Sequence, residues 1–302
     1  MIPFVKMHGS GNDFVIVHES ALTAPALDAA TRILDGDPPF AIDPAALTRA
    51  VCDRHFGVGA DGLLAWGLRP SRAGTARVRM YYWNADGSRA EMCGNGARCV
   101  ARLAWEDGAV GPAFELETDA GNRPVRVQKS AIGGPTVEID MGPAGWDPDA
   151  VPVRASAPVV LVPMTVNGEE LHVCAVSMGN PHAIVFVPDL AALEHVQLAT
   201  TGTALATHVA FPRGANASFV AVDAGGLHLR TWERGSGSTL ACGTATCAAF
   251  AAARRTRHLE AQRVRVHQPG GTVEVWEGAG GHLWMAGPAV KIAFGHLSAE
   301  TF

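Results

Sequence analysis

The sequence predicts an α+β protein made of two similar halves, each a mixed or antiparallel β-sheet or barrel wrapped around a central helix. Short strand-like segments outnumber helical ones and do not alternate with them strictly, which argues against a doubly wound parallel sheet. Two Cys-Gly segments, starting at Cys93 and Cys242, lie 149 positions apart (242 minus 93), about half of the chain. At 302 residues and 48% apolar composition, the chain is long enough to bury two cores.

Both Cys-Gly segments follow the same order of strand, turn, cysteine and helix. In the first half an expected strand at 76–83 precedes a turn at 84–87, and the helix at 96–106 stops before Gly108. In the second half the alternating segment 227–232 precedes a glycine-rich turn, and the helix covers 244–256.

Other segments predict further strands and two more helices. The expected strands are 4–7, 14–18, 114–118, 125–128, 136–141, 159–162, 171–176, 183–187, 218–222, 264–267 and 272–276, and the helices are 44–54 and 189–196. A Pro- and Gly-rich stretch marks a boundary, so we expect residues 1–142 and 143–286 as two domains, with 287–302 returning as a strand to the first.

Charge and hydropathy exclude several classes of protein. With 24 Lys and Arg against 29 Asp and Glu, the net charge of -5 offers no basic surface for nucleic acid or anionic lipid. The low net charge instead favours a small neutral or zwitterionic ligand over a polyanion. No apolar run approaches the roughly 18 residues of a membrane helix, and the N-terminus lacks signal-peptide features, so we expect a cytoplasmic protein.

The six cysteines do not suggest disulfides or a metal site. A chain without a secretion signal is expected to keep its thiols reduced, and no Cys-x-x-Cys pair is present, so we expect no metal. Four of the cysteines are expected to pack as small apolar side chains: Cys52, Cys99, Cys174 and Cys247.

Cys93 and Cys242 differ from these because each directly precedes a helix. The free N–H groups and the positive end of the helix dipole favour a thiolate there, and the backbone N–H groups of Gly94, Asn95, Gly243 and Thr244 can bind a carboxylate. A base and an acid on opposite faces of one carbon are what stereochemical inversion requires. Only three lysines are present, none in an obvious phosphate-binding context, so we expect no pyridoxal phosphate and no other cofactor.

The chain resembles the diaminopimelate epimerase family of cofactor-independent, two-cysteine enzymes. The resemblance rests on six blocks in family order: 6–14 (KMHGSGNDF), 53–62 (DRHFGVGADG), 84–88 (NADGS), 92–99 (MCGNGARC), 177–182 (SMGNPH) and 233–244 (ERGSGSTLACGT). It implies conversion of LL-2,6-diaminopimelate to the meso form in lysine and peptidoglycan-precursor synthesis, by a homodimer.

The resemblance also implies roles for single residues. Cys93 and Cys242 are the acid and base, and His182 and Glu233 assist them. The substrate is held by side chains and by backbone N–H groups: Asn12, Asn84, Asn180, Asn216, Glu233 and Arg234, with Gly94, Asn95, Gly243 and Thr244 at the carboxylate of the inverted carbon. Arg234 can bind the distant carboxylate in a bidentate manner.

The sequence departs from the family pattern at four places. Ser238 replaces a glutamate and Ala245 a glycine beside the second cysteine, which leaves substrate identity less secure than reaction type. Trp284 replaces a tyrosine implicated in dimer contacts, and 22–44 is interpreted as an added surface loop without an assigned role.

Two alternative functions remain open on the sequence. A racemase for proline, hydroxyproline or histidine would use the same scaffold, although Glu233 and Arg234 favour a substrate with two amino-acid heads. A thiol redox sensor would instead join Cys93 and Cys242 in a regulatory disulfide, and it would not exchange α-hydrogens.

Overall fold

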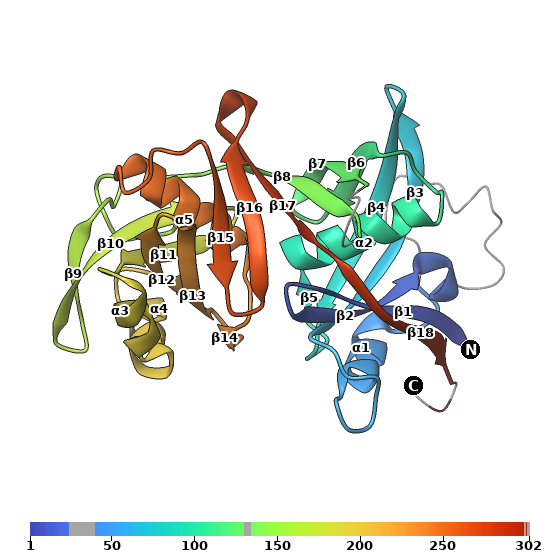
Figure 1. Cartoon of the computed structure of the whole chain (residues 1–302). Coiled ribbons are helices and arrows are strands. Elements are labelled where there is room, and N and C mark those ends of the chain that lie inside the picture. Colours follow the sequence, from blue (N-terminus) through green and yellow to red (C-terminus); the bar gives the residue numbers. More distant parts are fainter. Residues whose placement is uncertain (24–39, 130–133, 299, 301–302) are drawn as a thin grey trace. The chain divides into compact units, whose positions relative to one another are not determined.

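The computed structural model describes residues 1–23, 40–129, 134–298 and 300, and it divides into two compact units (Figure 1). Unit 1 comprises Met1–Ile139 together with Gly287–Phe302, and unit 2 comprises Asp140–Ala286. The change between units therefore falls three residues before the expected boundary at 142, and the chain returns to unit 1 at Gly287.

Unit 1 contains a mixed sheet. Its strands are β1 (Ile2–Gly9), β2 (Asn12–His18), β3 (Gly62–Arg72), β4 (Thr75–Asn84), β5 (Arg89–Ala90), β6 (Ala113–Thr118), β7 (Gly121–Gln128), β8 (Thr136–Pro143) and β18 (Val290–Leu297). Two pairs are parallel, β2 with β3 and β4 with β6. The other pairs are antiparallel: β18 with β1, β1 with β2, β3 with β4, β4 with β5, β6 with β7, and β7 with β8. The helices are η1 (Glu19–Ala21), α1 (Pro44–Cys52) and α2 (Gly94–Glu106).

Unit 2 repeats this plan strand for strand, with β10 to β17 in the places of β1 to β8 and the same parallel and antiparallel pairings; β9 adds to β10 as β18 adds to β1. The strands are β9 (Val162–Val166), β10 (Glu169–Ser177), β11 (Pro181–Phe186), β12 (Asn216–Asp223), β13 (Gly226–Glu233), β14 (Gly237–Thr239), β15 (Arg263–Gln268), β16 (Gly271–Glu277) and β17 (His282–Pro288). The helices are α3 (Leu190–His195), η3 (Leu198–Gly202), α4 (Thr203–Ala206), α5 (Gly243–Arg255) and η4 (Ala279–Gly281).

One helix fills the centre of each unit. α2 packs against β1, β2, β3, β4 and β7, and α5 packs against the equivalent strands β10, β11, β12, β13 and β16. Alanines and glycines along both helices let the strands approach closely, so α2 buries Gly94 to Ala101 without a break and α5 buries Thr246 to Ala253. The predicted α+β fold with two pseudo-symmetric units, each a sheet around a central helix, is confirmed.

Most predicted strands are present, and the errors have local causes. The expected strand at 159–162 is wrong because Leu161 adopts a positive φ of 53°, so β9 begins only at Val162. The predicted strands did not include β3, β5, β14 and β17. In β3 a glycine, which is unfavourable in a strand, is required at position 67, because a Cβ there would lie 1.9 Å from Glu19 Oε1.

The expected helices exist with shifted ends. α1 ends at Cys52 rather than at 54, because the Asp53 carboxylate turns to accept the backbone N–H groups of His55 and Phe56. Within the described residues no helix has the length and apolar character needed to cross a membrane. The expected surface loop at 22–44 lies mostly outside the described residues.

Candidate active site

Cys93 and Cys242 occupy equivalent positions, as the N-cap residues of α2 and α5. Both have extended backbones, with φ and ψ of −141° and 117° at Cys93 and −125° and 113° at Cys242. Each carbonyl accepts the first helical hydrogen bond, from Ala97 N at 2.8 Å and from Thr246 N at 3.0 Å. Neither helix has a side-chain cap hydrogen bond, and N–H groups of a first turn can bind an anion.

The remaining predicted residues gather at one sheet edge in each unit. In unit 1, Asn12 begins β2, and the register pairs Phe14 with Gly62 and Gly62 with Asn84. In unit 2, His182 pairs with Asn216, which lies beside Glu233 at the end of β13. The two registers make Asn12 equivalent to Asn180, Phe14 to His182, and Asn84 to Glu233.

Asn12 contacts the Cys93 thiol. The sulfur lies 3.5 Å from Asn12 Oδ1, which also accepts from Asn95 Nδ2 at 3.3 Å. Asn84 lies at the end of β4, which is separated from β2 by β3, and donates to Ser88 Oγ at 3.0 Å. Of the predicted unit 1 residues, Cys93, Asn12 and Asn95 are therefore in direct contact.

Charged groups fix the direction of these amides. Buried Arg98 donates to Asn95 Oδ1 at 2.8 Å, and Asn12 Nδ2 donates to Asp61 Oδ2 at 2.7 Å. A guanidinium only donates hydrogen bonds and a carboxylate only accepts them. Each amide therefore has only one possible orientation, and the Asn12 oxygen lies toward Cys93. Gly9 makes room for this arrangement, since a Cβ there would lie 2.9 Å from the Asn95 carbonyl oxygen.

Glu233 is the group beside Cys242. Its Oε2 lies 3.1 Å from Cys242 Sγ, and Thr244 Oγ1 lies 3.5 Å from the same sulfur. Burial raises the pKa of the Cys242 thiol well above its usual value, and the Glu233 carboxylate raises it further. Burial and the neighbouring negative charge thus oppose the thiolate that the helix end favours, and they stabilise the thiol form of Cys242.

Two residues that the sequence did not single out support Cys242. Gln268, at the end of β15, accepts the Cys242 backbone N–H with its Oε1 at 2.9 Å. Thr239, in β14, donates to Glu233 Oε1 at 2.6 Å. Thr239 lies inside the 233–244 motif block, and this position could have marked it as a site residue. No feature of the sequence distinguishes Gln268.

His182 and Asn180 form a second pair near the N-terminus of α5. His182 Nε2 lies 2.9 Å from Asn180 Oδ1, and Asn180 Nδ2 lies 3.4 Å from Thr244 Oγ1. Burial lowers the pKa of His182 to about 3, with a further contribution from Arg234, so the ring is neutral and donates through Nε2. His182 thus orients Asn180 within unit 2.

Arg234 is exposed at the end of β13 and is tethered at two points. Its backbone N–H donates to Asn216 Oδ1 at 2.8 Å, and its Nη1 donates to the Arg213 carbonyl at 2.8 Å. The Arg234 side chain is exposed, so a ligand can reach it from solvent.

The other four cysteines are buried free thiols. Burial raises the pKa of Cys52 and of Cys99 to about 12. In the described part of the chain, no three His, Cys, Asp or Glu side chains cluster as metal ligands would.

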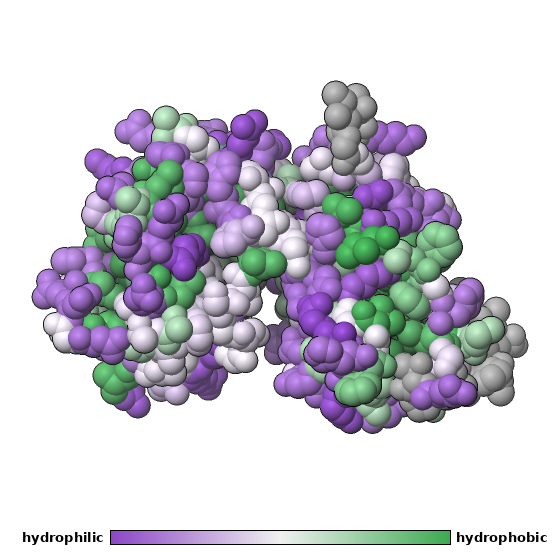
Figure 2. All heavy atoms as spheres, turned by 60° about the horizontal axis from the view of Figure 1, so that its bottom comes forward, coloured by the Kyte–Doolittle hydropathy of each residue, from purple (hydrophilic) through white to green (hydrophobic). Residues whose placement is uncertain are grey.

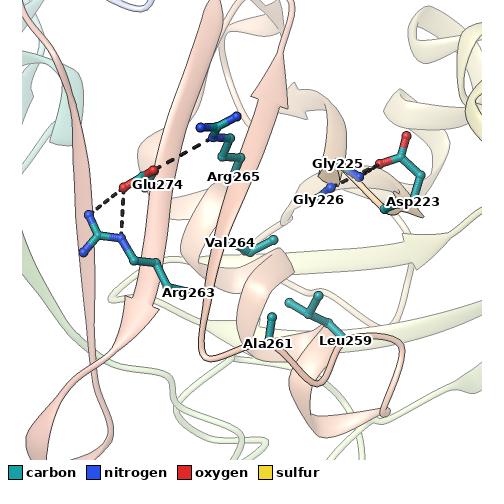
Figure 3. Close-up of a pocket in the computed structure, with 10 residues that line it drawn as sticks. Asp223, Gly225, Gly226, Leu259, Ala261, Arg263, Val264, Arg265 and Glu274 are labelled. Atoms are coloured by element: carbon teal, nitrogen blue, oxygen red, sulfur yellow. Dashed lines mark hydrogen bonds and ion pairs between the residues drawn. The ribbon is translucent and has the colours of Figure 1, made fainter.

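A separate pocket of about 490 Å³ is lined by residues that follow the C-terminal end of α5 (Figure 3). Leu259 and Ala261, which follow α5, line it together with the turn that joins β12 to β13. Its charged groups already have partners: Arg263 Nε donates to Glu274 at 2.9 Å, and Asp223 accepts two backbone N–H groups of its own turn. The predicted residues lie elsewhere, so this pocket is not the candidate site.

Comparisons with known proteins agree on one family. The sequence model described as Diaminopimelate epimerase matches residues 4–146 and 174–292. A Moorella thermoacetica protein named diaminopimelate epimerase is 40% identical over 98% of this chain and 99% of its own length. Proteins of the same name from Desulforudis audaxviator (41% identical, covering 96% of each chain) and Nitrosomonas europaea (37% identical, covering 98% of each) are similarly related.

Solved structures match the fold at low sequence identity. A probable proline racemase from Agrobacterium radiobacter aligns with a TM-score of 0.67 and 16% identity, over all of this chain and 94% of that one. A phenazine biosynthesis protein of the PhzF family from Bacillus anthracis aligns with a TM-score of 0.66 and 17% identity, over 98% of this chain and 99% of that one. The same architecture is thus present in proteins with several different names.

Proposed function

Because the chain belongs to the diaminopimelate epimerase family, we propose that it epimerises LL-2,6-diaminopimelate to the meso isomer without a cofactor. The observation that carries the proposal is the equivalent placement of Cys93 and Cys242, each at the N-terminus of the central helix of its unit. The enzyme is an isomerase, and its substrate is a small zwitterionic amino acid.

We propose that the two cysteines act as acid and base on opposite faces of one α-carbon. One sulfur, as a thiolate, takes the α-proton and becomes a thiol, while the other thiol gives its proton to the opposite face and becomes a thiolate. The developing carbanion is stabilised by the N–H groups at Gly94, Asn95, Gly243 and Thr244, which hold its carboxylate. The raised pKa of Cys242 supports a resting thiol there that is ready to deliver a proton.

For Cys242 to act as the base it must first lose its proton. Glu233 Oε2 lies 3.1 Å from the sulfur and can accept that proton. We assign Glu233 this assisting role, and we assign His182 to the orientation of Asn180.

Substrate recognition is proposed for amides and one arginine. Asn12, Asn84, Asn180 and Asn216 can fix the orientation of a zwitterion without adding charge. The exposed guanidinium of Arg234 suits the distant carboxylate, which favours a two-headed substrate over proline-like ones.

Hydrogen exchange tests the proposal. Reduced protein in deuterated water should place deuterium at the α-carbon of diaminopimelate, detected by mass spectrometry. Cys93→Ser and Cys242→Ser should each lower epimerisation by at least about a hundredfold, because each face needs its own proton carrier. An absence of exchange with any amino acid would contradict the enzyme assignment, and full activity of either variant would contradict the two-base mechanism.

We further propose that the protein is a homodimer and that β18 forms its interface. Val290, Ile292 and Phe294 alternate along β18 and are 39%, 55% and 89% exposed. Figure 2 shows that hydrophobic side chains reach the surface of unit 1 among mostly hydrophilic ones. Trp284, the expected interface anchor, instead stacks on Trp276 with ring centroids 6.3 Å apart, so its role in a dimer stays a prediction.

Sedimentation can test this interface. Phe294→Asp should convert a dimer to a monomer, since a carboxylate would enter an apolar contact. Val209→Asp is the matched control, because Val209 is an isolated exposed apolar residue of unit 2 at 69% exposure. A dimer that persists in the Phe294 variant would place the interface elsewhere.

We also propose a cytoplasmic location. The six cysteines, none of which is in a disulfide, support a reducing environment.

A further inference from the structure

Glu233 uses its two carboxylate oxygens for different partners. Oε1 accepts the Thr239 hydroxyl at 2.6 Å, whereas Oε2 faces Cys242 Sγ at 3.1 Å. Thr239 lies on β14, whose register places it opposite Thr231 on β13, two residues before Glu233. The hydroxyl and the carboxylate are therefore fixed to each other by a two-strand ladder rather than by a flexible loop.

Unit 1 supplies an internal comparison for this pair. Asn84 stands at the position of Glu233, and Ala90, opposite Tyr82 on β4, stands at the position of Thr239. Where the carboxylate is absent, the hydroxyl is absent too, although the strands, the helix and the cysteine are shared. The Thr239 hydroxyl therefore occurs together with the carboxylate and is not a requirement of the shared fold.

We propose that Thr239 is a positioning residue that holds the Glu233 carboxylate with Oε2 toward Cys242 and directs proton exchange to that oxygen. The inference rests on the proposed function, because it assigns a role within the same proton relay. Thr239 acts through Glu233 and is not itself a group that meets the substrate.

The physical basis is the difference that one hydrogen bond makes between two oxygens. An oxygen that already accepts a hydrogen bond is the weaker base, so a proton that arrives at Glu233 binds at Oε2. When Cys242 becomes a base, its S–H bond breaks and an O–H bond forms at Oε2, and the reverse transfer restores the thiol. Without the hydroxyl the carboxylate can rotate away from Cys242, because the donor that fixes Oε1 is lost.

Kinetics of Thr239→Val and Thr239→Ser test the role, since valine keeps the shape and serine keeps the hydroxyl. We expect Thr239→Val to lower kcat about tenfold with KM within about twofold, as one positioned proton-transfer group contributes 10²–10⁴-fold and only its alignment is lost. Thr239→Ser should restore kcat. An unchanged kcat in the valine variant, or a serine variant as impaired as valine, would overturn the role.

A second readout does not depend on any substrate. Alkylation by iodoacetamide, followed at the separate Cys93 and Cys242 peptides by mass spectrometry, reports the reactivity of each thiol. In Thr239→Val the rotated carboxylate no longer opposes the Cys242 thiolate, so Cys242 should react several-fold faster at pH 8 while Cys93 and the serine variant stay unchanged. Unchanged Cys242 reactivity would overturn the proposal. The two proposals can fail separately. If the wild-type protein does not turn over diaminopimelate while Thr239→Val still raises the reactivity of Cys242 selectively, the proposed function is contradicted and the Thr239 contact is supported.

Discussion

The two cysteines have equivalent backbones but face different side chains. Cys242 faces a carboxylate, and Cys93 faces the oxygen of the Asn12 amide. A carboxylate can accept a proton, whereas an amide oxygen can accept only a hydrogen bond at neutral pH. We infer that Glu233 takes the proton of Cys242, a role that the Asn12 amide cannot fill for Cys93, so the two half-reactions are not assisted by the same kind of group.

His182 should set the stability of the protein in mildly acidic solution. Its pKa is about 3 in the folded state and about 6.5 when unfolded, so between these values only the unfolded chain binds the proton. The free energy of unfolding should therefore be insensitive to this group above pH 6.5 and fall by about 1.4 kcal/mol per pH unit below it. His182→Gln, which keeps a donor for Asn180, should flatten the slope of stability between pH 6.5 and 5 in urea titrations.

The control for this prediction is His172→Gln, which changes an exposed histidine of the same unit. It should keep the wild-type slope. An equal slope in wild type and His182→Gln would show that the ring is not held neutral in the folded protein.

At the residue scale the sequence predicted which side chains matter better than it predicted their ionisation. The motif blocks contain Cys242, Glu233 and Thr239, but a helix-end argument alone indicated a thiolate at Cys242. Burial of the sulfur and the approach of Glu233 depend on the pairing of β13 with β14, which a linear sequence does not display.

The central helices explain why the fold could be predicted at the scale of elements. Each follows a strand and a turn, begins after a cysteine, and carries small residues that fit inside a sheet. Strand β3 could not be predicted in the same way, because its Gly67 is required by the close approach of Glu19 and therefore imitates a loop signal. Whether such a position belongs to a strand depends on tertiary contacts and not on local propensity.

Ala245, which stands where the family has glycine, should affect the helix and not the substrate. Its side chain is fully buried in the first turn of α5, so no ligand can touch it in this structure. Ala245→Gly should lower the free energy of unfolding by about 1 kcal/mol through helix propensity, with KM for diaminopimelate within about twofold. Ala251→Gly, in the middle of the same helix, is the matched control and should lose similar stability. A marked change in KM confined to the Ala245 variant would show that this position shapes the substrate site.

At the scale of the whole molecule, the two units differ in how the chain builds them. Unit 2 is one continuous segment, whereas unit 1 combines the first 139 residues with the C-terminal segment from Gly287. That segment supplies β18 to β1, and its Pro288 and Ala289 carbonyls accept hydrogen bonds from Arg98 and Arg102 of α2. Arg98 is fully buried, so loss of these acceptors would leave a buried donor unsatisfied.

This difference predicts which parts of the chain fold independently. Residues 140–286 expressed alone should fold cooperatively, while residues 1–139 alone should not, because β1 and α2 lack their C-terminal partners. Since Leu297 pairs with Ile2, the end of β18 adjoins the start of β1, and a two-residue Asn-Gly turn can connect them as a hairpin. A permuted chain of 287–298, Asn-Gly and 1–139 should therefore recover a sharp thermal transition and amide protection in α2. Equal folding of 1–139 with and without the added strand would show instead that the C-terminal segment contributes nothing to the stability of unit 1.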